Sequence, residues 1–577
     1  MASLKQVDSR IALDKRAVLN RYEKTAQVRP YQLDCIEEIT DALAQGKDVD
    51  IDLPTGSGKT VIYVPAAIEA ADQGKRVAIL APTKAAQNRI AKEVKRFGPE
   101  SAVETIYGYN EYFCPVIQNK AENWLCGELK EKSCIPNALG CGVIRSDDAY
   151  AKHSLIITNF AKFLSAHSKT TFDLVIIDDS HSFENAKEQA FQVIIRYDTL
   201  VTAEQQFASN PLLTGVLSSL RAIFAVVWSR CVSPGKFDGN IADDYVKQIA
   251  DTIVTPENKE PILNAIRSLS PDDQKVLWDA YYFVARCQKR THHLFFVRRD
   301  YYGRNDIAGA QLIARQSPDN ERFLVRRRFG GARVILSTAT PGNVFAHASA
   351  CTTRRYSEQS LDVVPASRHA EIENWFKNLK IYAIRDLGEA KDSETFQRCL
   401  GLTGDILTAV RVKSLILFKN YRDQRLARDG LESRVGAGRM YFIDEVKPLD
   451  FVDEISNLKE VIVASASSTI WEGINIDGLR LVVIISPPFI KPPIAGSKES
   501  GYQHGERRML MRLQQGIGRV IRDPNDFGAA VLMDSKFQRY VKNREFSERL
   551  KQRVVGIDSS QLLSSLSLDL GNRGGNH

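Results

Sequence analysis

Residues 49–60 read VDIDLPTGSGKT, and an apolar helical pattern follows them over residues 61–72. The first four residues alternate as a strand does, and the glycines after them let backbone N–H groups approach phosphate oxygens. Lys59 offers a positive charge to the β- and γ-phosphates, and the start of the next helix favours anions. Leu53 replaces the glycine of the generic pattern, but strand, loop and helix come in order, which disfavours a chance glycine-rich turn. The stretch predicts a phosphate-binding loop in which Thr60 can also bind magnesium, formed by Thr55, Gly56, Ser57, Gly58, Lys59 and Thr60.

Short runs rich in Val, Ile and Leu recur along the chain and predict buried parallel strands. Several lead into helical patterns such as Lys84–Phe97, which is typical of open doubly wound sheets. The fold class is therefore α/β. The runs cover residues 77–80, 155–157, 174–177, 334–336, 415–418, 461–463, 481–485 and 530–533. Between residues 183 and 320 these strand-like runs are absent and the sequence becomes helical in pattern. We expect an inserted helical domain there, with core aromatics Trp228, Trp278, Tyr281, Tyr282 and Phe283.

The apolar run at residues 174–177 ends in Asp-Asp-Ser-His, residues 178–181. Two carboxylates at the tip of a buried strand are tolerable when a metal or a catalytic role compensates their desolvation. We expect Asp178 to hold magnesium through water and Asp179 to act as the general base that orients the attacking water. A surface acidic turn is the weaker alternative at this position.

Three later segments contain further motifs: Ser-Thr-Ala-Thr at residues 337–340, TIWEGIN at 469–475 and QQGIGRVIR at 514–522. The last contains Gln-x-x-Gly-Arg-x-x-Arg, which begins at Gln515. Its two guanidinium groups, Arg519 and Arg522, suit a γ-phosphate across a cleft, where they would neutralise charge in the transition state. A solvated basic helix face is the ordinary alternative for such arginines.

Four of the nine cysteines are bunched, at Cys114, Cys126, Cys134 and Cys141. They lack the tight Cys-x-x-Cys pairs of common zinc sites, so zinc is less favoured, and four thiolates suit a 4Fe-4S cubane cluster. Four unrelated reduced thiols are the remaining alternative. An odd cysteine count spread through a long chain argues against a disulfide framework.

Taken in order, these motifs resemble those of superfamily 2 iron–sulfur helicases of the XPD and DinG family, closest to bacterial DinG-like enzymes. The family's acidic motif is Asp-Glu-Ala-His, so Asp179 replaces a Glu. The shorter side chain retracts the carboxylate by roughly 1.5 Å, and a displacement of that order can slow hydrolysis about 100-fold. Asn475 replaces the Asp of Trp-Glu-Gly-Ile-Asp and is assigned with Gly473 to the nucleotide site. Gln32, in RPYQ at residues 29–32, is assigned to adenine.

The resemblance implies two doubly wound RecA-like motor domains with an inserted iron–sulfur domain and an inserted helical arch. The expected cofactors are ATP, Mg²⁺ and a 4Fe-4S cluster held by the four bunched cysteines. The implied activity is ATP-dependent movement 5′ to 3′ along single-stranded DNA, with unwinding of forked duplex. Its setting would be DNA repair or CRISPR-linked defence, with repair proteins or a CRISPR effector complex as partners.

The expected domain bounds follow from the same resemblance. Residues 1–20 form an extension, and residues 551–577 form a tail. The first motor comprises residues 21–105, 151–190 and 321–345, interrupted by the iron–sulfur domain at 106–150 and the arch at 191–320. The second motor covers residues 346–550.

Composition is compatible with this assignment but does not prove it. The 577 residues carry a formal net charge of +8, which permits a polyanionic partner. Neither the amino terminus nor any later run reads as a signal or a transmembrane segment, so a cytoplasmic protein without a membrane partner is expected. We also expect a monomer. Two alternatives stay open: an ATP-gated DNA-binding or recruitment module with weak turnover, and an RNA-directed motor.

Overall fold

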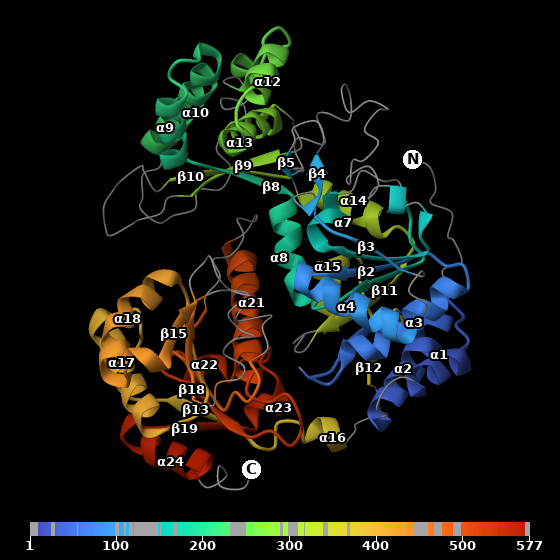
Figure 1. The fold of residues 1–577 in the computed structure, drawn as a ribbon, viewed down its shortest axis with the longest axis vertical. Coiled ribbons are helices and arrows are strands. Elements are labelled where there is room, and N and C mark those ends of the chain that lie inside the picture. The colour runs from blue at the N-terminus through green and yellow to red at the C-terminus, as the bar shows by residue number, and fades with distance from the viewer. Residues whose placement is uncertain are drawn as a thin grey trace.

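The protein is described by a computed structural model at residues 10–24, 29–54, 56–98, 103–108, 111–114, 119–120, 148–150, 152–165, 170–230, 250–288, 292–297, 310–316, 318–338, 344–365, 370–443, 458, 460–466, 476–488 and 498–571. Figure 1 shows two units of sheet and helix beside each other, with a smaller unit at one end. We call them the first α/β unit, the second α/β unit and the inserted unit.

The first α/β unit is built on a seven-stranded sheet of order β12-β1-β11-β7-β2-β6-β3. Every neighbouring pair is parallel. Its central strands are apolar on both faces, as expected for a sheet covered by helices on each side. The strands are β1 (Asp48–Asp52), β2 (Val77–Ala81), β3 (Val103–Ile106), β6 (Leu155–Asn159), β7 (Leu174–Ile177), β11 (Arg333–Thr338) and β12 (Leu361–Val364).

Helices cover both faces of this sheet, and alternate strand residues point to the two layers. One core lies under α1 (Lys15–Glu23), α2 (Pro30–Ala44), α3 (Lys59–Asp72) and α4 (Lys84–Phe97). The other lies under α7 (Phe160–Ser165), α8 (His181–Ala190), α14 (Pro318–Phe329) and α15 (Val344–Thr352). Thr83 caps α4 because its hydroxyl accepts from the Ala86 N–H at 3.1 Å.

The second α/β unit repeats this architecture, with seven parallel strands in the order β15-β16-β14-β17-β18-β13-β19. These are β13 (Leu379–Ile384), β14 (Ser414–Leu417), β15 (Met440–Ile443), β16 (Ile462–Ser465), β17 (Leu481–Ile484), β18 (Gly528–Leu532) and β19 (Val554–Ile557). One face packs on α17 (Ser393–Ala409), α18 (Tyr421–Val435) and α24 (Ser559–Gly571). The other face packs on α21 (Lys498–Gly518), α22 (Phe537–Tyr540) and α23 (Glu548–Lys551).

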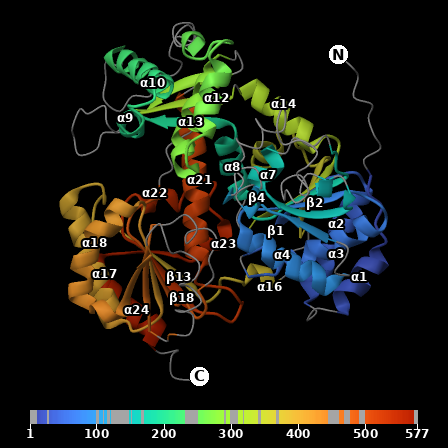
Figure 2. The same cartoon turned by 45° about the horizontal axis from the view of Figure 1, so that its top comes forward.

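The two α/β units contact each other. In both views α21 lies on the side of the second unit that faces the first (Figure 1, Figure 2). Tyr31 of α2 packs edge-on against Trp375, with ring centroids 6.3 Å apart. Trp375 lies between α16 (Ala370–Glu373) and β13, so the connection between the units is anchored on the first unit. The short 3₁₀ helix Ala437–Arg439 precedes β15.

The inserted unit combines helices with a three-stranded antiparallel sheet of order β8-β10-β9. The strands are β8 (Gln192–Arg196), β9 (His292–Val297) and β10 (Gln311–Gln316), and the helices are α9 (Tyr197–Gln206), α10 (Pro211–Arg230), α12 (Lys259–Arg267) and α13 (Pro271–Cys287). Trp278 and Phe283 are fully buried in its core and Tyr281 is buried, Tyr282 packs against that core, and the Trp228 side chain lies outside the described residues. The sequence predicts helices alone here. The strands give little local signal, because only one of the five β8 residues is buried and the pairing partner of β8 lies more than a hundred residues away.

The eight predicted strands and the helix at Lys84–Phe97 are confirmed, but several elements differ from the predicted division of the chain. Most of α1 falls in the predicted extension at 1–20 and most of α15 in the predicted second motor, and both helices pack into the first α/β unit. β12 joins the first sheet beside β1, although residues from 346 onward were assigned to the second motor. β19 pairs with β13, and α24 buries Leu562, Leu566 and Leu570 against the second sheet, so the predicted tail at 551–577 contributes core. The repeat of leucine every fourth residue explains the helical packing.

Within the parts of the chain that the structure describes, no helix has both the length and the apolar character needed to cross a membrane.

Candidate functional site

The loop after β1 has the conformation that its glycines permit. Gly56 and Gly58 have φ of +86° and +82°, a left-handed region that favours glycine. Gly58 caps α3, so the N–H groups of the first helical turn face the loop. The Lys59 ammonium donates to the carbonyl oxygens of Leu53 and Pro54, both at 3.1 Å. Burial lowers the pKa of Lys59, with Asp179 and Asp178 acting in the opposite direction.

Two side chains of α2 hold this loop in place. Gln32 donates its amide N–H to the Ser57 carbonyl at 2.6 Å, and the Tyr31 hydroxyl donates to the same oxygen at 2.8 Å. The Gln32 amide oxygen accepts from the Tyr22 hydroxyl. Gln32 therefore couples the loop to two helices, while its assignment to adenine stays a prediction.

The acidic pair lies at the end of β7. Asp178 is 2% exposed and pairs with Arg89 of α4, with Oδ2 and Nη2 3.2 Å apart. Burial, and then the charge of Asp179, raise the pKa of Asp178 to about 6. Asp179 has a φ of +47°, which is rare for a residue with a side chain. The negative charges of Asp178 and Asp179 therefore repel each other at the end of β7.

The residues after the pair connect to the end of β11. His181 Nδ1 lies 3.5 Å from the Thr338 hydroxyl, and His181 Nε2 lies 2.9 Å from the Ser182 hydroxyl. The Ser180 N–H donates to the Ser337 carbonyl at 2.9 Å. The Ser-Thr start of the segment at 337–340 is therefore joined to the acidic motif, and residues 339 and 340 lie outside the described residues.

The second α/β unit meets the phosphate-binding loop at Arg522. A Cβ atom on Gly56 would collide with the Arg522 carbonyl oxygen, so only glycine permits this approach. Burial lowers the pKa of Arg522 to about 10, against the attraction of Asp477 and Asp179. The nearby pairs Arg29–Asp523, at 3.5 Å, and Arg549–Asp52, at 3.9 Å, also join the two units.

The structure brings together, at one junction of the two units that is called the cleft below, Gln32, Gly56, Ser57, Gly58, Lys59, Thr60, Asp178, Asp179 and Arg522. Gln515 and Arg519 are buried, at 7% and 5% exposed, where α21 ends. Thr55, Gly473 and Asn475 lie outside the described residues. Asp179 attracts the cations of Arg522, Lys59 and Arg89.

The residues at this cleft fit a magnesium ion. Thr60 lies in the first turn of α3, and the buried Asp178 and its neighbour Asp179 form an acidic pair whose repulsion a divalent cation would relieve. Thr60 and Asp178 would hold the ion, which would offset the negative charge of the phosphates.

Several residues of the site could not be recognised in the sequence. Arg89 approaches Asp178 from one turn inside α4, and Tyr63 of α3 is fully buried near both. Asp52, predicted only as a strand residue, faces Arg549 of the other unit. None of them belongs to a spaced motif. Only the fold brings them to the site.

The four bunched cysteines are mostly outside the described residues, namely Cys126, Cys134 and Cys141. Cys114 ends β4 (Phe113–Cys114), which pairs with β5 (Asn119–Lys120) as a short antiparallel hairpin. Among the described residues no group of three or more His, Cys, Asp or Glu could hold a metal ion. The cluster and its zinc alternative stay predictions.

Asp178→Asn is expected to stabilise the protein at neutral pH. The folded-state pKa of Asp178, about 6, lies above its ordinary value of 3.8. The free energy of unfolding therefore falls as the pH rises from 3.8 to about 6. Removing the charge should raise the free energy of unfolding by about 1–3 kcal/mol near pH 7.5. Thermal melts of both proteins near pH 7.5 and near pH 5 test this.

The melting difference should shrink near pH 5, because the wild-type carboxyl is then largely protonated. Asp405→Asn is the matched control, since that side chain is 56% exposed. A variant that melts below the wild type at both pH values would show that the Arg89 pair outweighs the repulsion.

Two family models match the chain. A model described as the helicase C-terminal domain covers residues 404–553. A model described as the type III restriction enzyme res subunit covers residues 25–203. The first contains most of the second α/β unit, and the second contains the phosphate-binding loop and the acidic pair.

Full-length likenesses agree with these matches. A probable ATP-dependent helicase of Methanocaldococcus jannaschii is 23% identical over 635 residues, which cover 89% of this chain and 92% of that protein. A solved XPD helicase superimposes with a TM-score of 0.62 at 14% identity, covering 92% of this chain and 100% of that one. An Xpd protein of S. tokodaii gives 0.55 at 14% identity, with the same coverage. Together these likenesses show an XPD-like fold and two regions that match helicase and restriction-enzyme family models, in a chain similar along most of its length to a probable ATP-dependent helicase.

Proposed function

We propose that this chain is an ATP-dependent DNA helicase that moves 5′ to 3′ on single-stranded DNA and unwinds forked duplex. The observation that carries the proposal is the junction of the two α/β units, where the Arg522 carbonyl of the second unit lies against Gly56 and the Arg522 guanidinium is attracted by Asp179 of the first. A nucleotide bound there contacts both units, so its hydrolysis changes the free energy of their closed arrangement.

Each residue at the cleft has a role in this proposal. The N–H groups of the loop and Lys59 bind the β- and γ-phosphates, and Thr60 and Asp178 hold magnesium. Asp179 orients the attacking water and accepts its proton. Arg522, together with Gln515 on α21 and Arg519 just after that helix, stabilises the charge that develops on the γ-phosphate.

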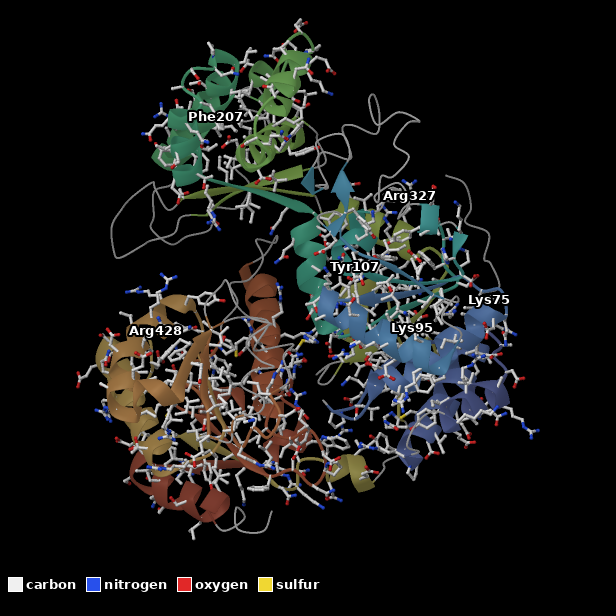
Figure 3. All side chains as sticks on the ribbon, in the orientation of Figure 1. Lys75, Lys95, Tyr107, Phe207, Arg327 and Arg428 are labelled. Atoms are coloured by element: carbon white, nitrogen blue, oxygen red, sulfur yellow. The ribbon has the colours of Figure 1, made fainter. Side chains whose placement is uncertain are left out.

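The link to the nucleic acid is proposed to run through the segment after β11. His181 lies two residues after Asp179 and contacts Thr338. A movement of the 337–340 segment would therefore be passed through His181 to the acidic pair. DNA would be held by its phosphates along loops after the strands of both sheets. Tyr107 marks one such edge beside α4 (Figure 3), where its hydroxyl donates to Asn88 at 2.7 Å and its ring lies 5.5 Å from the Lys84 ammonium.

The finer features of the proposal follow the resemblance. A DinG-like chain would carry a 4Fe-4S cluster on Cys114, Cys126, Cys134 and Cys141, in the segment from 106 to 150, and use the inserted unit as an arch. It would act as a cytoplasmic monomer on DNA supplied by repair proteins or by a CRISPR effector complex. Co-purification with either kind of partner separates those two settings.

Anaerobically purified protein is expected to contain about four iron and four sulfide per chain. Cys134→Ser should remove the cluster's visible absorption, whereas Cys287→Ser, which changes a scattered buried thiol, should keep it. Zinc without iron in the wild-type protein would contradict the cluster and support the zinc alternative.

The experiment that tests the proposed function is ATP hydrolysis with no nucleic acid, with single-stranded DNA and with RNA of the same sequence. Stimulation by DNA above RNA supports a DNA-directed motor. Stimulation by RNA alone would contradict it in favour of an RNA motor. Tight ATP-dependent DNA binding with no turnover would instead identify an ATP-gated binding module.

A further inference from the structure

Helix α15 holds Ser180, the residue after Asp179, at two atoms. His347 Nε2 lies 2.8 Å from the Ser180 hydroxyl, and the Cys351 thiol donates to the Ser180 carbonyl at 3.5 Å. The Ser180 N–H is held from a third side by the Ser337 carbonyl. Ser180, His347 and Cys351 are all fully buried. The hydroxyl, carbonyl and amide groups of Ser180 are thus all held by neighbouring residues.

The two α15 side chains are uncharged, which suits this arrangement. Burial lowers the pKa of His347 to about 3, and the charges of Arg507 on α21 and of His181 act in the same direction. A neutral imidazole keeps one ring nitrogen as an acceptor, so the Ser180 hydroxyl can donate to Nε2. Burial raises the pKa of the Cys351 thiol, so its proton remains available to the Ser180 carbonyl.

The fixed Ser180 explains the unusual backbone of its neighbour. A left-handed φ of +47° at Asp179 is costly for a residue with a side chain, and such conformations persist where the surroundings determine them. Asp179 lies close enough to Lys59 and Arg522 to influence the pKa of both. The backbone conformation therefore directs the Asp179 carboxylate toward the groups expected around the γ-phosphate.

Two departures from Asp-Glu-Ala-His occur side by side in this chain. Asp179 is shorter than Glu, and Ser180 has a hydroxyl that Ala lacks. Without that hydroxyl, the contact with His347 could not form. The Ser180 hydroxyl thus adds a restraint directly after Asp179, the residue whose side chain is shorter than Glu.

We propose that His347 and Cys351 are positioning residues for ATP hydrolysis, which act through Ser180 to hold the Asp179 carboxylate on the attacking water. This inference rests on the proposed function, because it needs a hydrolysed nucleotide at the cleft. It also assigns a role to α15, the first described helix after the 337–340 segment. A shift of α15 would move the general base.

Steady-state ATP hydrolysis by Ser180→Ala, His347→Leu and the double variant tests the proposal. Each single variant is expected to lose about 10-fold to 100-fold in kcat, because the base is displaced, with KM for ATP unchanged. The double variant should lose no more than the worse single variant, since both remove one contact. His347→Gln, whose amide can accept the same hydrogen bond, should recover most of the lost kcat.

Ser349→Ala is the matched control, because it removes a hydroxyl of the same helix that donates only to the Phe345 carbonyl. It should keep the wild-type kcat. Should His347→Leu fail to fold, Ser180→Ala with a wild-type Tm decides the question alone. Wild-type kcat in Ser180→Ala, or independent losses that add in the double variant, would overturn the proposal. A wild-type protein that binds ATP without hydrolysing it would instead overturn the proposed function.

Discussion

Arg522→Ala is expected to lower kcat for ATP hydrolysis by about 10³-fold, the effect typical of losing an arginine that stabilises transferred phosphate. Arg522 comes from the second α/β unit, and its backbone touches Gly56 in the phosphate-binding loop. The Arg522 side chain is partly buried, and burial lowers its pKa to about 10 against the attraction of Asp477 and Asp179. Single-turnover hydrolysis with excess enzyme measures the loss.

Arg544→Ala is the control for this variant, because that arginine belongs to the same unit and its side chain is 93% exposed. It should hydrolyse ATP at the wild-type rate. Binding of ATP by Arg522→Ala should remain within a few-fold of wild type, since the loop and Lys59 are untouched. A kcat loss below about 10-fold would contradict the assignment of Arg522 to the transition state.

Asp179→Asn is expected to lower kcat by about 10²-fold to 10⁴-fold while ATP binding is retained, because the general base loses its charge. Asn matches Asp in shape and is one of the few residues that tolerate a left-handed backbone, so the φ of +47° can be kept. The variant therefore isolates the charge from the conformation. Rapid-quench kinetics separates the chemical step from product release.

Asp423→Asn, at the first turn of α18 and away from the cleft, is the comparison for removal of one carboxylate. Its hydrolysis rate should match the wild type. If Asp179→Asn hydrolysed ATP as fast as the wild type, Asp179 would not be the base. The effects expected at Ser180 and His347 would then lose their basis as well.

The sequence predicted the parts of the fold whose signal is local. Buried parallel strands such as β2 and β7 are continuous apolar runs, and helices such as α4 carry a clear amphipathic period. β8 and β10 could not be read this way, because their pairing is non-local and only one of the five β8 residues is buried. β19 was missed because a run of four residues, only one of them buried, gives little signal.

Site residues were likewise predictable only where they belong to a local sequence motif. Lys59, Asp178, Asp179 and Arg522 were predictable because each occupies a fixed place in a spaced motif. Arg89, His347 and Cys351 belong to no such motif, and only the packing of α4 and α15 against the end of β7 brings them to the acidic pair. His347, for instance, interrupts an apolar stretch of α15 and would ordinarily be assigned to the core.

ATP-driven strand separation is the activity proposed for this protein, and tailed duplexes measure it. Duplexes that carry either a 5′ or a 3′ single-stranded tail are incubated with anaerobically purified protein, ATP and magnesium, with Arg522→Ala in parallel. We predict that the wild type unwinds only the 5′-tailed duplex and that Arg522→Ala unwinds neither. Failure of the wild type to separate either duplex, with ATP-dependent DNA binding retained, would contradict it.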